Sequence, residues 1–304
     1  MSGNAFRWLV LALLALTPAS GRPKETRIIG VSLLTLQHHF SRELQAGLEE
    51  QARAYGWQVT VVAGEFDAAR QARQLDGFIA RRVDAIVVAP CDSDEIGASI
   101  EQANKAGIPV FTTDIASTSR VGRVVAHVAS DNVLGGRRAG ALMVQALGGR
   151  GDIVLVTHPS VTSVSDRIRG FKDVVARAGG IRIVAEVPAW GQRARATEVV
   201  EDLLEHLPDV RGIFAINDDS ALGALAAVKA AGRAGTIVIV GYDATPEARE
   251  AIRRGDLHGD VVQYPRKIGA LTIGAVRDHL AGRKVPARIA VETGVFTAQD
   301  ARRK

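Results

Sequence analysis

Cysteine is nearly absent from this 304-residue sequence, which contains Cys91 and no other. A single cysteine cannot form an intramolecular disulfide, and none lies in the N-terminal region to carry a lipid. Cys91 ends an apolar run and has no base among its neighbours in sequence, so we expect a small buried residue rather than a nucleophile. The chain is 47% hydrophobic, which provides a core large enough to fold without disulfides in an oxidising compartment such as the bacterial periplasm.

Long apolar runs are also absent, apart from one near the N-terminus. Residues 8–16 (WLVLALLAL) follow Arg7, and they are too few to span a bilayer. The small residues Ala19 and Gly21 come shortly afterwards. This pattern predicts a secretory signal peptide over residues 1–21 and a mature protein in the periplasm, with a buried N-terminal strand or helix as the alternative.

A concentrated basic surface is a third feature that the sequence lacks. The net charge is +5, but the arginines are scattered, and no basic stripe alternates with aromatic residues. No helix-turn-helix segment precedes the first predicted strand. We therefore interpret the charge as solvated helix faces and predict no binding to nucleic acid.

Motifs of the common enzyme classes are missing as well. The sequence has no Gly-x-Gly-x-x-Gly after the first strand, no phosphate-binding loop and no Gly-x-Ser-x-Gly. His38 and His39 are adjacent, so they diverge in an extended loop, and no third metal ligand accompanies them. We predict a protein that is not an enzyme and that has no metal and no cofactor.

The most informative stretch begins at residue 210 and reads VRGIFAINDDSALGALAAVKAAGRAGTIVIVGYD. An apolar run at 213–216 is followed at once by Asn217 and other helix-capping residues. An alanine-rich helix over 221–231 then leads to a β-branched run over 236–240, which ends just before Asp243. Ligands of open parallel sheets bind at the carboxyl ends of strands, so Asn217 and Asp243 are candidates for one site.

The same plan occurs earlier, over residues 83–114. A strand at 85–89, a helix at 95–106 and a second apolar run lead to Asp114. The recurrence predicts two similar α/β lobes, each of which ends a central strand with an aspartate. The alternative is that any two strand–helix–strand units look alike.

Strands and helices alternate along the whole mature chain, which predicts a parallel sheet in each of two domains. No low-complexity linker separates the halves. We therefore expect the chain to pass between the lobes more than once.

Four motifs carry a resemblance to a known family. The sequence is similar to the ribose-type periplasmic sugar-binding proteins of ABC importers, which are type I, LacI-like solute-binding proteins, over residues 27–296. The motifs are HVASDNVLGGRRAG (127–140), DRIRGF (166–171), IFAINDDSALGALAAVKAAG (213–232) and IVGYDATP (239–246).

The resemblance implies the fold and the way in which it works. It implies two Rossmann-like lobes joined by three hinge crossovers, which close around a sugar. The N-terminal lobe would comprise residues 27–130 plus 264–292, and the C-terminal lobe residues 131–263 plus 293–304. The implied partners are a small sugar or polyol and an ABC transporter permease in the inner membrane, and we expect a monomer.

The resemblance also implies a ligand site built from residues of both lobes. A carboxylate accepts bonds from sugar hydroxyls, a guanidinium donates to them, and a carboxamide does both. We place His38 in the first-loop contact and Trp190 near a second aromatic position. The residues that match the family's ligand contacts are Phe40, Asp114, Arg167, Asn217, Asp243 and Gln263.

Three departures from the ribose binders argue against ribose as the ligand. Ile115 replaces an arginine, His38 replaces an asparagine, and Ser41 replaces a stacking phenylalanine. We therefore predict a different monosaccharide or polyol.

Other functions on the same fold stay open at this stage. A transcription regulator would need a DNA-binding domain where this chain has its predicted leader. An input protein of a chemoreceptor is compatible with sugar transport. An enzyme acting on a sugar would use Asp114 and Asp243 as an acid and base pair, but no nucleophile accompanies them.

Overall fold

The computed structural model describes residues 26–302 and contains two sheets of six strands each. Sheet A has the strand order β11-β5-β4-β3-β1-β2, and sheet B has the order β12-β10-β9-β8-β6-β7. The strands of sheet A are β1 (Ile28–Leu33), β2 (Gln58–Ala63), β3 (Ala85–Val88), β4 (Val110–Thr113), β5 (Val124–Ser130) and β11 (Arg288–Val291). The strands of sheet B are β6 (Arg150–Thr157), β7 (Gly180–Pro188), β8 (Val210–Ala215), β9 (Val238–Asp243), β10 (Gly259–Val262) and β12 (Gly294–Thr297).

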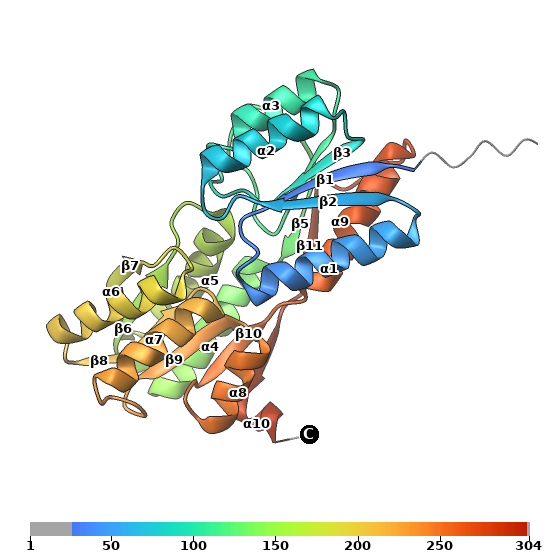
Figure 1. Cartoon of the computed structure of the whole chain (residues 1–304). Helices are drawn as coiled ribbons and strands as arrows, with labels where there is room; N and C mark the ends of the chain where they lie inside the picture. Colours follow the sequence, from blue (N-terminus) through green and yellow to red (C-terminus); the bar gives the residue numbers. More distant parts are fainter. Residues whose placement is uncertain (1–25, 303–304) are drawn as a thin grey trace, which may run out of the picture.

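Helices cover the faces of both sheets, so that the chain forms two α/β lobes (Figure 1). The helices on the lobe of sheet A are α1 (His39–Ala54), α2 (Ala68–Ala80), α3 (Gly97–Lys105) and α9 (Pro265–Leu280). Those on the lobe of sheet B are α4 (Asn132–Leu147), α5 (Thr162–Ala178), α6 (Arg193–His206), α7 (Asp218–Ala230), α8 (Pro246–Arg254) and α10 (Ala298–Ala301). Buried apolar clusters fill the space between each sheet and its helices.

The chain passes between the two sheets three times. It leaves sheet A after β5, returns to it through α9 and β11, and goes back to sheet B at β12. We keep the lobe boundaries proposed from the sequence, which are 27–130 plus 264–292 and 131–263 plus 293–304. The signal peptide predicted over residues 1–21 lies outside the described residues.

The helix α9 completes the lobe of sheet A although it comes from the last fifth of the chain. It lies beside α1 (Figure 1), and the two helices approach closely because each has a glycine at the contact. A Cβ on Gly47 would collide with the backbone of Arg266, and one on Gly269 would lie 2.6 Å from the carbonyl oxygen of Leu44. Any larger residue at either position would force the helices apart.

The predicted fold class is confirmed, and one strand differs from the prediction of wholly parallel sheets. The strand β12 pairs antiparallel with β10, whereas the other strand pairs are parallel. Only two residues separate β11 from β12, and a connection this short has no crossover helix. The sequence interpretation also assigned no strand at β5, β11 or β12, which are short or interrupted by polar residues.

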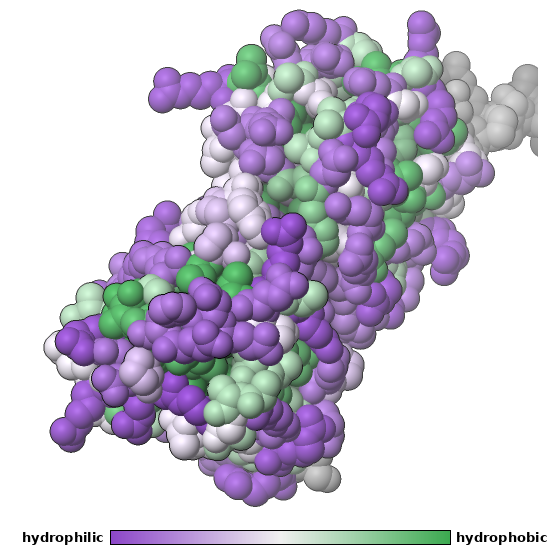
Figure 2. Space-filling view, turned by 60° about the vertical axis from the view of Figure 1, so that its left-hand side comes forward, coloured by the Kyte–Doolittle hydropathy of each residue, from purple (hydrophilic) through white to green (hydrophobic). Residues whose placement is uncertain are grey.

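Figure 2 shows the lobes as two masses joined by a narrower waist, with polar residues over most of the visible face. Within residues 26–302, no helix is both long and apolar enough to cross a membrane.

Candidate functional site

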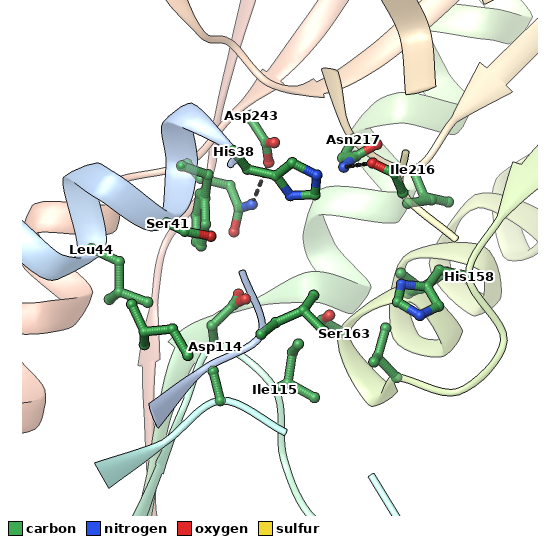
Figure 3. A pocket seen from close by; sticks show the side chains of 18 of the residues that line it. His38, Ser41, Leu44, Asp114, Ile115, His158, Ser163, Ile216, Asn217 and Asp243 are labelled. Atoms are coloured by element: carbon green, nitrogen blue, oxygen red, sulfur yellow. Dashed lines mark hydrogen bonds between the residues drawn. The ribbon is translucent and has the colours of Figure 1, made fainter. Parts of the chain in front are cut away.

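A cavity lies between the two lobes at the carboxyl ends of the central strands (Figure 3). Asp114 and Ile115 approach it from the lobe of sheet A, and Asn217 and Asp243 face them from the lobe of sheet B. Seven of the eight residues predicted to bind ligand line this cavity. They are His38, Phe40, Asp114, Arg167, Asn217, Asp243 and Gln263.

Asp114 and Asp243 occupy equivalent places in their lobes. Asp114 follows β4 directly, Asp243 is the last residue of β9, and their φ angles are 60° and 128°. Such angles are strained for any residue other than glycine and cluster at functional sites. The strained backbone turns the chain away from each sheet at the point where the carboxylate faces the cavity. Asp243 lies within β9, whereas the sequence predicted it just past the strand end.

Burial raises the pKa of both carboxyl groups. The pKa of Asp114 rises to about 6, although the nearby positive charge of Arg167 opposes the shift. Burial also raises the pKa of Asp243 well above its usual value, and the negative charge of Asp218 adds to this effect. Both groups therefore ionise less readily than an exposed carboxyl group, and a ligand that donates hydrogen bonds to them offsets part of the cost of burial.

Gln263, which directly follows β10, is hydrogen-bonded to Asp243. Its Nε2 donates a hydrogen bond of 2.7 Å to Oδ1 of Asp243, while its Oε1 is buried and has no donor within the described protein. Oδ1 of Asp114 is likewise buried and has no donor within the described protein. Unpaired buried acceptors are costly, by about 1–3 kcal/mol each, so both oxygens call for a ligand that supplies hydroxyl donors.

Arg167 is anchored in the lobe of sheet B before any ligand binds. Its Nε donates to Oδ1 of Asn132 at 2.9 Å, and its Nη1 donates to the carbonyl oxygen of Ile216 at 2.6 Å. The guanidinium carbon lies 3.9 Å from the ring centroid of Tyr242, which is a cation–π contact. The side chain is only 5% exposed, so its orientation toward the cavity is fixed by the fold.

Asn217 has two roles at the end of β8. Its Oδ1 accepts a hydrogen bond of 3.0 Å from the backbone N–H of Ser220 and thereby caps α7, as the sequence predicted. Its Nδ2 donates to the carbonyl oxygen of Gly191 at 3.0 Å. The amide is thus held in the cavity wall by contacts on both sides.

Two histidines, one from each lobe, meet at the edge of the cavity. His38 stacks edge-on against Phe66 at 5.5 Å between ring centroids, and Phe66 lies 6.4 Å from the ring of His158. Burial, together with the nearby His38, lowers the pKa of His158 to about 4. Burial also lowers the pKa of His38, although Asp219, at 3.8 Å, opposes the shift. Both rings are therefore neutral at pH 7.

One wall of the cavity is apolar. Ile115 belongs to a buried cluster that otherwise lies in the lobe of sheet B, and it contributes to the same wall as Val161 and Val164. Phe40 lines the cavity and is also part of the core of the other lobe, with 8% exposure. A hydroxyl group that pointed at this wall would find no charged partner at Ile115.

Trp190 lies apart from the other seven predicted residues. It lines a neighbouring cavity together with Glu65 and Phe66, and its ring contacts the edge of His158 at 5.5 Å. Its φ angle is 57°. Its predicted role in ligand binding stays a prediction.

Direct contacts between the lobes show that the cavity is closed. Ala116 donates its backbone N–H to Oγ1 of Thr162 at 2.9 Å, and Thr162 donates its own N–H to Oγ of Ser93 at 3.1 Å. Ser93 also donates its N–H to the carbonyl oxygen of Ser160 at 3.0 Å. These contacts join the two lobes at the mouth of the cleft.

The described residues contain no group of three or more histidine, cysteine or acidic side chains placed to hold a metal ion. His39 faces a different surface cavity from His38, beside Arg42 and Asp219. Cys91 is 5% exposed, as predicted, and burial raises the pKa of its thiol to about 12.

The sequence interpretation missed His158, Ser163 and the backbone of Gly191, all of which line the cavity. His158 directly follows the strand predicted over residues 153–157, so the rule that pointed to Asn217 would have pointed to it as well. The sequence predicts a loop over residues 158–166 and a helix from about residue 167, but α5 begins five residues earlier, at Thr162, and Ser163 lies in its first turn.

Comparisons with known proteins agree with this fold. A sequence profile described as a periplasmic binding protein domain matches residues 29–284. The ribose import binding protein of Salmonella typhimurium is 34% identical over 290 residues, which cover 95% of this chain and 96% of that protein. The D-apiose import binding protein of Paraburkholderia graminis is 31% identical over 260 residues, which cover 84% of this chain and 83% of that protein.

Solved structures agree with the sequence relatives. An ABC transporter solute-binding protein from Agrobacterium vitis, solved with bound alpha-D-tagatopyranose, superposes with a TM-score of 0.86. It is 27% identical, and the match covers 91% of this chain and 96% of that one.

Proposed function

Because the chain belongs to the periplasmic binding protein family, we propose that its interlobe cavity binds a monosaccharide or polyol for an ABC importer. The observation that carries this proposal is the pair of unpaired acceptor oxygens, on Asp114 of one lobe and Gln263 at the edge of the other, in the wall of one closed cavity. A ligand with several hydroxyl groups pairs both at once. The protein is a binding protein and not an enzyme.

The two lobes divide the recognition between them. Asp114 and His38 act from the lobe of sheet A, while Asp243, Asn217 and Arg167 act from the lobe of sheet B. A ligand that bonds to both sets binds the closed form more tightly than the open form, and this differential affinity closes the lobes. The closed shape is then what the permease recognises.

The location and the state of the protein follow from the same proposal. Family membership places it in the periplasm, and we propose that residues 1–21 are the signal peptide that takes it there. We further propose that it acts as a monomer. Delivery to a chemoreceptor or another sensor is the alternative use of the same closed form.

Loss of the leader is expected on export. The mature chain should lack residues 1–21, because the apolar run after Arg7 has the length of a signal-peptide core. Mass spectrometry of protein recovered from the periplasm checks this, and cytoplasmic protein from the same cells is the control. An exported chain that still begins at Met1 would contradict the proposal.

Ribose is expected to bind at least tenfold more weakly than the best ligand in a panel of sugars and polyols. Ile115 brings an apolar side chain to the wall where the ribose binders have a charged donor, so a hydroxyl at that place stays unpaired. A thermal-shift screen identifies the ligand, because a ligand at a hundred times its dissociation constant stabilises the fold by about 2.7 kcal/mol. Titration calorimetry then ranks it against ribose.

The Asp243→Ala variant is the control, and no member of the panel should shift its melting temperature. A ranking with ribose first would contradict the expected specificity, and a panel without any shift in the wild-type protein would contradict the proposed function itself.

A further inference from the structure

Two carboxylates meet behind the ligand site, where no positive charge separates them. Asp218 is the first residue of α7, Asp260 lies on β10, and both are buried, at 1% and 0% exposure. Asp260 pairs in register with Gly241 of the neighbouring strand β9. A Cβ on Gly241 would lie 2.9 Å from Oδ2 of Asp260 and 3.0 Å from Oδ1 of Asp218, so the two side chains converge over this glycine.

This pair of carboxyl groups has more buried acceptor oxygens than hydrogen-bond donors. Oδ1 of Asp218 and both carboxylate oxygens of Asp260 are buried and accept no hydrogen bond of good geometry within the described residues, although the backbone N–H of Ala244 lies close enough to Asp260 to oppose the rise of its pKa. Ionised carboxylates only accept hydrogen bonds, and two of them in contact repel. One proton placed between the two groups supplies the missing donor and removes one negative charge.

The other oxygen of Asp218 supports the turn that presents Asp243. Oδ2 of Asp218 accepts a hydrogen bond of 2.6 Å from the backbone N–H of Thr245. Asp243 and Ala244, which directly precede Thr245, have φ angles of 128° and 56°. A strained turn of this kind persists only when its surroundings hold it.

We propose that Asp218 and Asp260 share one proton, and that this protonated pair positions the Asp243 carboxylate by holding the strained turn at residues 243–245. The positioning role rests on the proposed function, whereas the shared proton does not. Burial raises the pKa of both groups. The negative charge of Asp218 raises the pKa of Asp260 further, whereas the hydrogen bond with Asp260 opposes the rise at Asp218. Of the charged groups on neighbouring elements, Asp219 acts on Asp218 and Asp243 acts on Asp260. Arg193 and Glu247 line the same surface cavity as Asp218, and Arg167 acts on Asp243.

The shared proton is expected to make the free energy of unfolding depend on pH. The unfolded chain has both carboxylates ionised above their ordinary pKa, and the folded pair retains one proton, so rising pH favours unfolding. In the Asp260→Asn variant, the amide donates permanently to Asp218 and the proton is no longer needed. Between pH 5 and pH 7, the unfolding constant of the wild type should rise about tenfold per pH unit more than that of Asp260→Asn.

Urea denaturation at each pH measures this difference. The control is Glu201→Gln, which removes an exposed carboxylate on α6 of the same lobe and should keep the wild-type slope. Equal slopes for the wild type and Asp260→Asn would overturn the shared proton.

Ligand affinity tests the positioning role. Asp218→Ala removes the acceptor for Thr245 and should weaken binding of the best panel ligand at least tenfold, while Asp218→Asn keeps that acceptor, donates to Asp260 and should stay within threefold of the wild type. If Asp218→Ala does not fold, Asp218→Ser keeps a polar group at the start of α7 but is too short to reach Thr245. A folded variant of either kind with wild-type affinity would overturn the positioning role. A wild-type protein that binds no sugar would instead refute the proposed function and leave the unfolding result standing.

Discussion

Replacing Asp243 with alanine is expected to weaken ligand binding at least a hundredfold while the protein stays folded. The change removes an acceptor for ligand hydroxyls and leaves Nε2 of Gln263 without its partner. At about 2 kcal/mol each, the middle of the usual range for an unpaired buried group, the two correspond to a loss of more than a hundredfold. The fold should tolerate the change, because Asp243 is a buried carboxyl group whose ionisation the protein already disfavours.

Titration calorimetry with the best panel ligand measures the effect, and thermal melting confirms the fold. Asp202→Ala, on the exposed face of α6, is the control and should bind as the wild type does. A loss smaller than about fivefold, or roughly 1 kcal/mol, would show that the site is wrongly assigned.

Arg167 is a less suitable position for this test than Asp243. Its guanidinium binds Asn132 and the carbonyl oxygen of Ile216 and stacks on Tyr242. Truncation to alanine would leave these buried groups unpaired, so we expect loss of stability together with loss of binding.

Acidification should weaken binding through His158. The ring is neutral and buried between the closed lobes, where its pKa is about 4, and opening exposes it and returns the pKa toward 6.5. The open form therefore binds more protons than the closed form, and falling pH favours opening. From pH 7.5 to pH 5, the wild type should lose roughly 25-fold more affinity than His158→Gln.

Comparing the wild type with His158→Gln separates the contribution of His158 to the pH dependence from the contributions of neighbouring titratable groups. His38 acts in the same direction as His158, whereas burial raises the pKa of Asp114 and Asp243, so these carboxyl groups act in the opposite direction. Calorimetry over this pH range is the measurement, with small-angle scattering at pH 7.5 to show that ligand reduces the radius of gyration.

His127 offers a matched control for the pH experiment. Burial also lowers its pKa to about 4, but it lies on β5 inside the lobe of sheet A, where it contacts Oγ1 of Thr112. His127→Gln should retain the wild-type pH dependence of binding. The same pH dependence in His158→Gln and the wild type would contradict the role of His158.

The sequence was sufficient to predict features that depend on one strand and the residue after it. Asp114, Asn217 and Asp243 were found because polar residues follow apolar runs, and parallel strands bring such residues to one edge of the sheet. The alternation of strands and helices likewise predicted the fold class. These signals lie within short stretches of sequence, and the structure contains the features that they predict.

Features that depend on two distant segments could not be read in the same way. Asp218 and Asp260 look like ordinary surface carboxylates in sequence. They become neighbours only because β10 pairs with β9 and the start of α7 packs over Gly241 of β9. The start of α5 was misplaced because its first turn, at Thr162, is stabilised by contacts with the opposite lobe. A tryptophan one residue from Gly191 was expected in the cavity, but where its ring lies depends on the left-handed backbone at Trp190, which the sequence does not specify.

The contact between α1 and α9 has a consequence for the order of events during synthesis. The face of α1 around Gly47 is covered by residues that the ribosome adds more than two hundred positions later. Sheet A likewise gains its edge strand β11 only from residues 288–291. A nascent chain that ends before α9 therefore exposes part of the first lobe's core, and this lobe cannot finish folding until almost the whole polypeptide has been translated. Such a delay keeps the chain unfolded for longer, which suits the export across the membrane proposed above.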